Sequence, residues 1–421
     1  MFCRKINSFK MAISIPKILH QVNKMPKSKK KITSFSANVL FSNEELLSEI
    51  LLRVPVKSLV RCKCVSRKWL SLICSPQFTR LRIPRPRPAS GIFLYHCSFL
   101  TNPFHKFVSF SLENPIPVPL QKFPFLRHDD SHRIFISQSC NGLLLCRTFH
   151  NPFMFNESYY IINPTTQQFT TLPKPSSGDV VGMSLAFDPL KSPYYKVICL
   201  QISELEPANY QIEIYSSELK KWRVSGPPFP RDYDISFNYG LVYWNGAIYI
   251  SCNQCFNVEQ EKFEKVPILE VQEDHRIVYF GESYGHLHLI QVNRHNLAMY
   301  NIYEMNHDGT GWFLKYEVNV EDVVLAFPRM IRRYLETTDF HYYAMNVLNV
   351  VRGEREEDTF LILHIPEKAL LRYNLVDKSF YKLCDFDNGI HAEESDDEQL
   401  AVCLDFGRSS TYQYIESTYC W

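Results

Sequence analysis

The feature that most constrains the fold is a strand pattern that repeats along most of the chain. From residue 91 onward, short segments rich in Val, Ile, Tyr and Phe are separated by turns of Asn, Gly, Pro and Asp, which is the pattern of antiparallel strands. In one form of the repeat, a strand and a polar turn precede an aromatic residue that leads the next strand; the copies are FSLENPIPVPL, YIINPTTQQFTTLP, IYSSELKKWRVSG, CFNVEQEKFEKVP, MYNIYEMNHDGTGWFLKYEV and LRYNLVDKSFYKL. In a second form, a turn precedes an apolar strand, as in CNGLLLC, YWNGAIYI and SYGHLHLI. Asn-Gly suits a type I′ hairpin turn, because both central residues need positive φ.

This spacing predicts a β-propeller. The two forms recur roughly every 40–50 residues, which is the length of a four-stranded propeller blade. A propeller closes its blades into a ring and leaves only short, protected sheet edges. Six copies predict six blades, or seven if the ends of the chain contribute another. A β-sandwich is the alternative fold, but its scale of about 100 residues does not account for about 330 residues of regular repeats. One short helix is expected within this part, near residues 329–335.

The N-terminal part has the period of a helix instead. Over residues 43–54, apolar side chains fall at i, i+3, i+4 and i+7 on one helical face: Leu47, Ile50, Leu51 and Val54. Ser42, followed three residues later by Glu45, is a capping box that begins this helix. Pro55 ends it, because proline cannot continue the backbone hydrogen bonding.

Two further short helices are predicted, over residues 56–62 and 66–73. Three short helices in fewer than about 40 residues are near the lower limit for an independent core. We therefore expect this segment to need a partner. The run RLRIPRPRP that follows alternates Arg with Pro, which predicts a semi-rigid linker.

The run ILLRVPVKSLVRCKCVSRKWLSLI resembles the F-box. The chain departs from that family at Phe41-Ser42, where the family has a Leu-Pro dipeptide that helps to seat the adaptor. The resemblance implies docking on the Skp-type adaptor of a cullin–RING ubiquitin ligase, and through the adaptor on the cullin and the RING protein. It assigns adaptor binding to Leu46, Leu47, Ile50, Leu51, Pro55 and Leu59. It assigns the small F-box core to Val65, Trp69 and Ile73.

The remainder resembles the F-box-associated domain of plant F-box proteins, a kelch-like propeller. The matching pieces are SCNGLLLC, YYIINPTTQQFTTLP, LAFDPLKSPYYKVICL, IEIYSSELKKWR and YGLVYWNGAIYI. The last piece, YQYIESTYCW, resembles the family's C-terminal strand and is expected to close the ring against the first blade. The expected fold class is therefore α+β and multidomain, with a three-helix F-box followed by an all-β kelch-like propeller of six to seven blades. The expected divisions are a basic disordered tail (1–40), the F-box (41–79), a Pro/Arg linker (80–90) and the propeller (91–421).

Composition narrows the expected partners and compartment. A formal net charge of +2 gives no global electrostatic basis for binding nucleic acid or a membrane surface. No run approaches the ~20 apolar residues of a spanning helix, and the N-terminus lacks a secretory signal. Thirteen cysteines are then expected to be reduced thiols, in the nucleus and/or cytoplasm. The PKSKKK run in the tail is interpreted as a disordered basic stretch or as a nuclear import signal.

A search for catalytic patterns predicts no catalytic residue, metal or cofactor. No Walker loop, dinucleotide fingerprint, HExxH or GxSxG occurs, and these are the patterns that position phosphate, zinc or a nucleophile. Cys252 and Cys255 have CxxC spacing without a second pair at zinc-finger distance, and are expected to be two loop thiols. His286 and His288 share one face of a strand, but no third ligand is evident. In a modular ubiquitin ligase the recruited enzyme carries the chemistry and the F-box subunit supplies proximity.

The leading hypothesis is a substrate-recognition subunit in which the F-box holds the adaptor and the propeller holds a protein target for ubiquitination. One alternative is an F-box scaffold or sequestering protein outside the ligase. Another is a kelch-like enzyme resembling copper radical oxidases, against which the missing metal ligands and secretory signal argue. The sequence does not identify the target, because propeller loops vary while the frame stays constant.

The target is expected to bind on the propeller face away from the linker. The candidate loops are residues 151–157, 204–209 and 231–236, which are longer and less repetitive than the others. Aromatic and Arg side chains often anchor interfaces, and those in the candidate loops are Phe153, Phe155, Arg231 and Tyr233. The alternative is that these side chains only pack the loops.

Overall fold

A computed structural model describes most of the chain, and two compact units divide it at Pro55 and Val56. The described residues are 43–82, 87–96, 104–113, 115–119, 133–151, 154–175, 179–231, 241–250, 252–267, 269, 273–366, 369–385 and 411–419. None of the described helices is both long and apolar enough to cross a membrane.

In the first unit, the described structure is helix α2 (Glu44–Leu52). Its N-cap is Asn43, whose side-chain oxygen accepts the backbone N–H groups of Glu45 at 3.0 Å and Leu46 at 3.3 Å. Such a cap satisfies donors that the first helical turn leaves free. The cap therefore lies one residue later than predicted; Ser42 itself falls outside the described residues.

The second unit begins with three helices, α3 (Val56–Cys62), α4 (Arg67–Ile73) and α5 (Pro76–Arg82). The predicted bounds of α3 are confirmed, and α4 begins after Ser66, whose Oγ accepts the Trp69 N–H at 3.2 Å. Helix α5 was not predicted and extends into the expected linker. Pro76 occupies its first position, where a proline fits because that N–H has no helical partner.

The assignment of Val65 to the F-box core is wrong. This residue was predicted to lie in the F-box core, but it occupies the turn between α3 and α4 and is 55% exposed. Ile73 is fully buried, as predicted, and Trp69 is half-buried.

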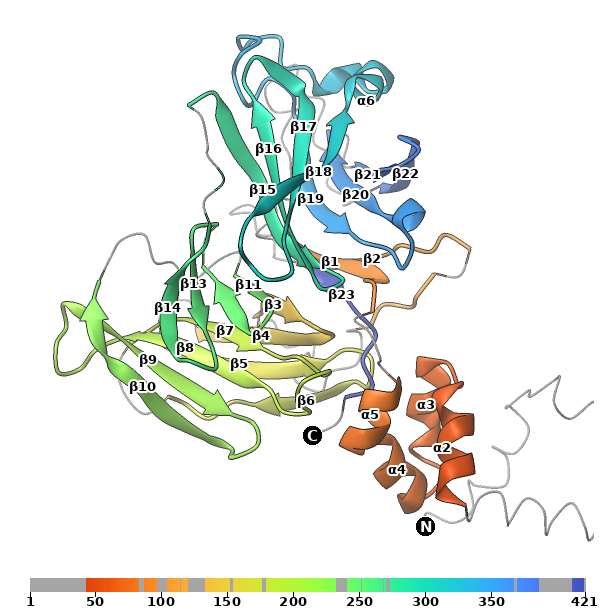
Figure 1. Ribbon diagram of the computed structural model, residues 1–421, viewed down its shortest axis with the longest axis vertical. Coiled ribbons are helices and arrows are strands. Elements are labelled where there is room, and N and C mark those ends of the chain that lie inside the picture. Colours follow the sequence, from red (N-terminus) through yellow and green to blue (C-terminus); the bar gives the residue numbers. More distant parts are fainter. Residues whose placement is uncertain are drawn as a thin grey trace, which may run out of the picture. The chain divides into compact units, whose positions relative to one another are not determined.

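The described strands after these helices form six antiparallel sheets, coloured from orange to blue in Figure 1. We number these blades 1 to 6. Blade 1 contains β2 (Phe104–Ser109), β1 (Gly91–His96) and β23 (Thr411–Tyr414) in that spatial order. Blade 2 contains β3 (Arg133–Cys140), β4 (Leu143–Asn151), β5 (Met154–Asn163) and β6 (Gln168–Thr171). Blade 3 contains β7 (Val180–Ala186), β8 (Lys196–Ile202), β9 (Asn209–Ser216) and β10 (Lys221–Pro230).

The other three blades have the same sequential strand order. Blade 4 contains β11 (Val242–Trp244), β12 (Ala247–Tyr249), β13 (Gln254–Asn257) and β14 (Lys262–Lys265). Blade 5 contains β15 (His275–Ser283), β16 (His286–Asn293), β17 (Asn296–Met305) and β18 (Trp312–Asn319). Blade 6 contains β19 (Asn346–Val351), β20 (Phe360–Ile365), β21 (Ala369–Asn374) and β22 (Phe380–Asp385). The fold is a six-bladed propeller, so the lower of the two predicted blade counts is confirmed.

The C-terminal strand closes the ring, as predicted. Strand β23 pairs antiparallel with β1, with Gly91 opposite Tyr414 and Leu94 opposite Thr411. On its other side β23 lies against β3, the first strand of blade 2. The innermost strand of blade 1 therefore comes from the opposite end of the chain to its two neighbours in the sheet.

The predicted helix near residues 329–335 is wrong. The chain between β18 and β19 forms α6 (Glu321–Ala326) and a short 3-10 turn, η2 (Pro328–Met330). Ile331 is already extended and bridges to Tyr343. Pro328 ends the α-helix one turn before the predicted segment begins, because proline cannot donate the next helical hydrogen bond.

Hairpin turns follow the first strand of several blades, and their backbone explains the repeated glycines. Asn141 and Gly142 after β3 have φ of 46° and 86°, and Asn245 and Gly246 after β11 have φ of 48° and 87°. Two consecutive positive φ values are what a type I′ turn requires. The Asn-Gly prediction is thus confirmed at both sites.

Gly142→Ala is expected to destabilise the propeller by about 2–4 kcal/mol, because left-handed strain of about 1 kcal/mol adds to a steric clash. A Cβ at Gly142 would lie 2.6 Å from Ser417 Cβ and 2.8 Å from the Ile415 carbonyl oxygen. Gly309→Ala is the matched control, since Gly309 also has positive φ but has no atom within 4 Å of the added Cβ. Urea denaturation of both variants measures the difference, and equal losses would show that the C-terminal segment yields freely.

Candidate functional site

Helix α2 presents two apolar side chains to solvent. Leu46 and Ile50, four residues apart, are 45% and 47% exposed, whereas Leu47 and Leu51 are buried. Residues four apart lie on the same side of a helix, so the exposed pair forms one small apolar surface.

The six residues assigned to adaptor binding therefore fall into two groups. Pro55 is exposed together with Leu46 and Ile50. The other three, Leu47, Leu51 and Leu59, are at most 1% exposed. Buried side chains of this kind shape the surface that an adaptor would meet, whereas the exposed ones are free to touch it, so the assignment to adaptor binding stays a prediction for all six residues.

The candidate target-binding residues are only partly described. Phe153 and Tyr233 lie outside the described residues, and Phe155 belongs to β5 with its side chain outside the description. Because β4 extends to Asn151 and β5 begins at Met154, the segment predicted as a loop over residues 151–157 is mostly a strand hairpin.

Arg231, which follows β10, contacts the connection between β8 and β9 and the first residues of β9. Its guanidinium lies 5.4 Å from the centre of the Tyr210 ring and donates a hydrogen bond from Nη1 to the Pro207 carbonyl oxygen at 3.2 Å. These contacts hold the connection between β8 and β9, which favours the packing alternative for this residue. The same connection contains Leu205, which is 91% exposed. The sequence could have indicated this exposure, because Leu205 is an apolar residue between two glutamates.

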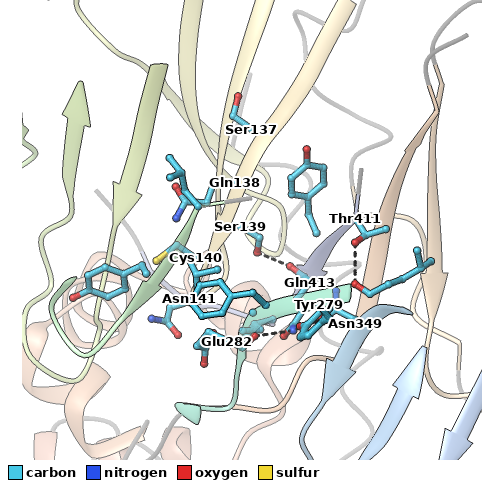
Figure 2. Close-up of a pocket in the computed structure, with 18 residues that line it drawn as sticks. Ser137, Gln138, Ser139, Cys140, Asn141, Tyr279, Glu282, Asn349, Thr411 and Gln413 are labelled. Atoms are coloured by element: carbon cyan, nitrogen blue, oxygen red, sulfur yellow. Dashed lines mark hydrogen bonds between the residues drawn. The ribbon is translucent and has the colours of Figure 1, made fainter. Parts of the chain in front are cut away.

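The innermost strands surround a polar central channel (Figure 2). A cavity of about 100 Å³ is lined by residues of β3, β15, β19 and β23 and by the start of β11. Ser139 Oγ donates to the Gln413 carbonyl oxygen at 2.5 Å, and Gln413 Nε2 donates to the Glu282 carbonyl oxygen at 3.0 Å. Polar side chains therefore connect β23 to blades 2 and 5.

Gln138 joins blades 2 and 3 in the same way. Its buried side chain accepts the Leu185 N–H at 2.7 Å and the Ser184 hydroxyl at 2.9 Å, and donates to the Leu185 carbonyl oxygen at 3.1 Å. The side-chain amide of Gln138 thus bonds the backbone of a strand in another sheet, as a neighbouring strand would do within one sheet.

A second cavity, of about 180 Å³, opens at one end of the channel; we call it the channel mouth. Turns that follow the first strands of blades 2 to 5 line it, together with the linker residue Arg87 and the C-terminal segment 415–417. Charged and aromatic residues among those that line the channel mouth include Arg87, Asp188, Tyr243, Trp244, Glu282 and Glu416. The channel mouth therefore lies on the linker side of the propeller. Connections between antiparallel strands alternate between the two faces, so the described connection between β8 and β9, residues 203–208, lies on the opposite face.

A buried ionic cluster lies between blades 5 and 6. Glu304 accepts Arg352 Nη1 at 2.7 Å, and its other oxygen is 2.8 Å from His286 Nδ1. His288 Nε2 is 3.7 Å from the same carboxylate, and His288 is fully buried. The two histidines do share a strand face, as the sequence indicated, but the charge beside them is a carboxylate. Among the described residues, no group of three or more His, Cys, Asp or Glu is arranged to hold a metal ion.

Charges and burial set the pKa values in this cluster. Burial by itself would raise the pKa of Glu304, but the hydrogen bond from His286 and the charges of His286 and Arg352 outweigh it and lower the pKa to about 2. Burial lowers the pKa of His288 to about 3. Glu304 is thus a carboxylate and His288 a neutral imidazole near neutral pH.

The two cysteines of the CxxC motif differ in burial. Cys252 is half-buried and Cys255 is buried. Cys255 belongs to β13, so the expectation of a loop position is wrong for this residue.

Two family descriptions match the chain. "F-box domain" matches residues 43–81, and "F-box associated beta propeller domain" matches residues 95–313. The second match alone spans about half of the sequence and coincides with β-structure from blade 1 to blade 5.

Curated relatives have the same organisation. The chain is 36% identical over 378 residues to "F-box protein At5g07610" of Arabidopsis thaliana, covering 84% of this chain and 88% of that relative. It is 29% identical over 243 residues to "F-box protein At5g65850" of the same plant, covering 54% and 56%. Among solved structures, TolB from Acinetobacter baumannii aligns at 10% identity with a TM-score of 0.35, covering 72% of this chain and 65% of that one.

Proposed function

The chain belongs to the F-box proteins that carry an F-box-associated β-propeller domain, and from this we propose that it is the substrate-recognition subunit of an SCF-type cullin–RING ubiquitin ligase. In this proposal the F-box binds a Skp-type adaptor and the propeller binds the protein to be ubiquitinated. F-box proteins with a propeller are of the substrate-adaptor type. We propose in addition that the ligase is of the SCF type and that the target is a protein.

The observation that carries the proposal is the exposed apolar pair on α2. Leu46 and Ile50 lie in the matched F-box and are nearly half exposed, although burying such side chains would be favourable by about 1.5–3 kcal/mol each. A helix that keeps two large apolar residues in solvent, next to buried leucines of the same helix, fits a surface that is covered in a complex.

The propeller supports the second half of the proposal. Its closed ring of six blades holds many surface loops on a rigid frame, and recognition residues are often found on such loops. A receptor that holds a target beside a recruited enzyme contributes proximity, which lowers the entropic part of the barrier. This role asks for no catalytic group in the receptor.

A non-ligase scaffold or sequestering protein is the second candidate. The sequence observation that favours it is Phe41-Ser42, which stands where the F-box family has Leu-Pro. Co-purification of the intact protein with adaptor and cullin separates the two functions. Adaptor without cullin, or neither, would favour the scaffold.

Replacing both Leu46 and Ile50 by Asp is expected to weaken adaptor binding at least 100-fold. Two lost apolar contacts and two desolvated charges together exceed about 3 kcal/mol. Because both side chains are exposed, the melting temperature should stay within about 2 °C of the wild-type value. Titration of purified chain against adaptor, by interferometry or calorimetry, measures the change.

Two comparison variants make this test specific. Leu205→Asp alters the 91% exposed leucine of blade 3 and should leave adaptor affinity unchanged. Leu51→Asp places a charge at a fully buried position and should lower helix stability as well as binding. Unreduced adaptor affinity of the Leu46/Ile50 double variant would refute the assignment of this surface.

A further inference from the structure

The channel mouth contains a carboxylate whose hydrogen bonding the fold leaves incomplete. Glu282 lies near the end of β15 and lines both cavities of the channel. Its Oε1 accepts the Gly285 N–H at 2.6 Å, and no second donor reaches the carboxylate among the described residues. An ionised carboxylate has about four acceptor positions, so most of its capacity faces the cavities.

The surroundings of Glu282 oppose its negative charge. Burial raises its pKa to about 7; the Gly285 N–H lowers it, and the neighbouring Asp188 raises it further. Enclosing a carboxylate without a counter-charge costs free energy that an incoming cation would recover. The site is therefore electrostatically prepared for a positively charged group.

The other side chains of the channel mouth add to this preference. Asp188 and Glu416 supply two more carboxyl groups, while Arg87 is the one Lys or Arg side chain among the described lining residues. Arg87 Nη1 donates to the backbone oxygen of Glu416 at 3.4 Å. Arg82 and Arg87 both interact electrostatically with Glu416, so the carboxyl groups left to attract an incoming cation are Glu282 and Asp188.

Aromatic walls give the cavity a shape. Trp244 Nε1 donates to the Gly285 carbonyl oxygen at 2.8 Å, which fixes the indole beside the turn that also holds Glu282. Tyr243 lines both cavities. Aromatic faces beside carboxylates suit a planar cation, since a guanidinium stacks on a ring while its edge donates to oxygen.

We propose that the channel mouth binds an arginine side chain of the target protein, with its guanidinium facing the Glu282 carboxylate. This places the target contact on the linker side of the propeller, not on the opposite face that was expected from the sequence. This inference rests on the proposed function in so far as the ligand is part of a protein target. The cavity, at about 180 Å³, is smaller than the ~300 Å³ at which pockets for drug-sized molecules begin. It matches one long side chain rather than a whole small molecule. A guanidinium is favoured over an ammonium because its several donors in one plane can reach two carboxylates at once.

The test compares two probes that differ only in charge. N-acetyl-arginine methylamide carries the guanidinium, and N-acetyl-citrulline methylamide replaces it with a neutral urea of nearly the same shape. Both are titrated against the full chain by ligand-observed NMR. The arginine probe is expected to bind at least 10-fold more tightly than the citrulline probe, which corresponds to about 1.4 kcal/mol.

The variant Glu282→Gln is expected to remove this preference. Glu218→Gln is the matched control, because Glu218 is exposed in the turn between β9 and β10, and it should keep the preference. The melting temperature at pH 8 supplies a second readout. The glutamine side-chain oxygen still accepts the Gly285 N–H without the cost of a buried charge, so Glu282→Gln should melt at or above the wild-type temperature. If the carboxylate instead stabilised the fold, its replacement would lower the melting temperature.

Three results would overturn the proposal. They are equal affinity of the two probes, a preference that survives in Glu282→Gln, and no binding of the arginine probe up to about 50 mM. None of them touches the adaptor titration of the Leu46/Ile50 variant. Failure of the arginine site and failure of the ligase function are therefore observed in separate experiments.

Discussion

Deleting residues 411–421 is expected to abolish the folded propeller. Strand β23 is the innermost strand of blade 1, and its removal leaves the β1 edge unpaired from Gly91 to Leu94. Tyr414, which is 2% exposed, also packs against Phe93 and Phe107, with ring centroids 5.8 Å and 5.4 Å away. An exposed inner edge next to an open core is prone to aggregation.

The segment after β23 adds to this loss. Asn163 Nδ2 donates to the carbonyl oxygens of Ser417 at 3.2 Å and Tyr419 at 3.0 Å. The Tyr419 ring lies 4.9 Å from that of Phe187 in blade 3. The C-terminal residues thus connect blades 1, 2 and 3, and their removal should cost most of the 5–15 kcal/mol that stabilises a typical domain.

Limited proteolysis and size-exclusion chromatography of the truncated chain measure this effect. A milder pair of variants accompanies the deletion. Tyr414→Ala should cost about 3–5 kcal/mol as a buried aromatic truncation, whereas Tyr334→Ala, at a half-exposed position, should cost less than about 0.5 kcal/mol. A truncated protein that remains monomeric and protease-resistant would disprove closure by the C-terminus.

The second large effect is expected at the buried ionic cluster. Glu304→Gln should destabilise the propeller by about 3 kcal/mol, because a pKa lowered from 4.5 to about 2 converts at about 1.4 kcal/mol per unit. Breaking a buried pair leaves Arg352 without its counter-charge, and such losses are typically about 3–5 kcal/mol. Glu357→Gln is the matched control, since its pair with Arg355 is largely exposed and should contribute less than about 1 kcal/mol.

The effect of Glu304 depends on pH in a defined direction. The folded protein holds this carboxyl at a lower pKa than the unfolded chain does, so the stabilisation is present above about pH 4.5 and is lost as pH falls toward 2. His288 acts in the same sense, because the unfolded chain takes up a proton near pH 6.5 and the folded protein only near pH 3. Urea denaturation between pH 7 and pH 3 should show the wild type approaching Glu304→Gln. A difference that is constant with pH would contradict the charge argument.

Local patterns in the sequence were sufficient for some of the elements and for the number of blades. The bounds of α3 and the Asn-Gly turns at Asn141 and Asn245 were predicted, because each depends on residues that are neighbours in the chain. The blade count followed from the repeat, since each blade uses the same strand and turn pattern. Closure by the C-terminal strand followed from a resemblance and is confirmed by its pairing with β1. Two local predictions failed. The helix that Pro76 begins runs to Arg82, into the segment where Arg-Pro alternation predicted a linker, and Val65 lies in a turn although its neighbours have a helical period.

Only the tertiary structure decided which side chains meet. The helical period placed Ile50 on the same face as Leu47 and Leu51, but Ile50 is 47% exposed whereas the two leucines are buried. Glu304 finds Arg352, 48 residues away, and Gln138 bonds Leu185 of the next blade. Glu282 shares a cavity with Glu416, which belongs to the C-terminal segment after β23. The physical reason is that periodicity fixes the direction of a side chain relative to its own strand, whereas the charge or cavity opposite it is set by how separate blades close around one axis.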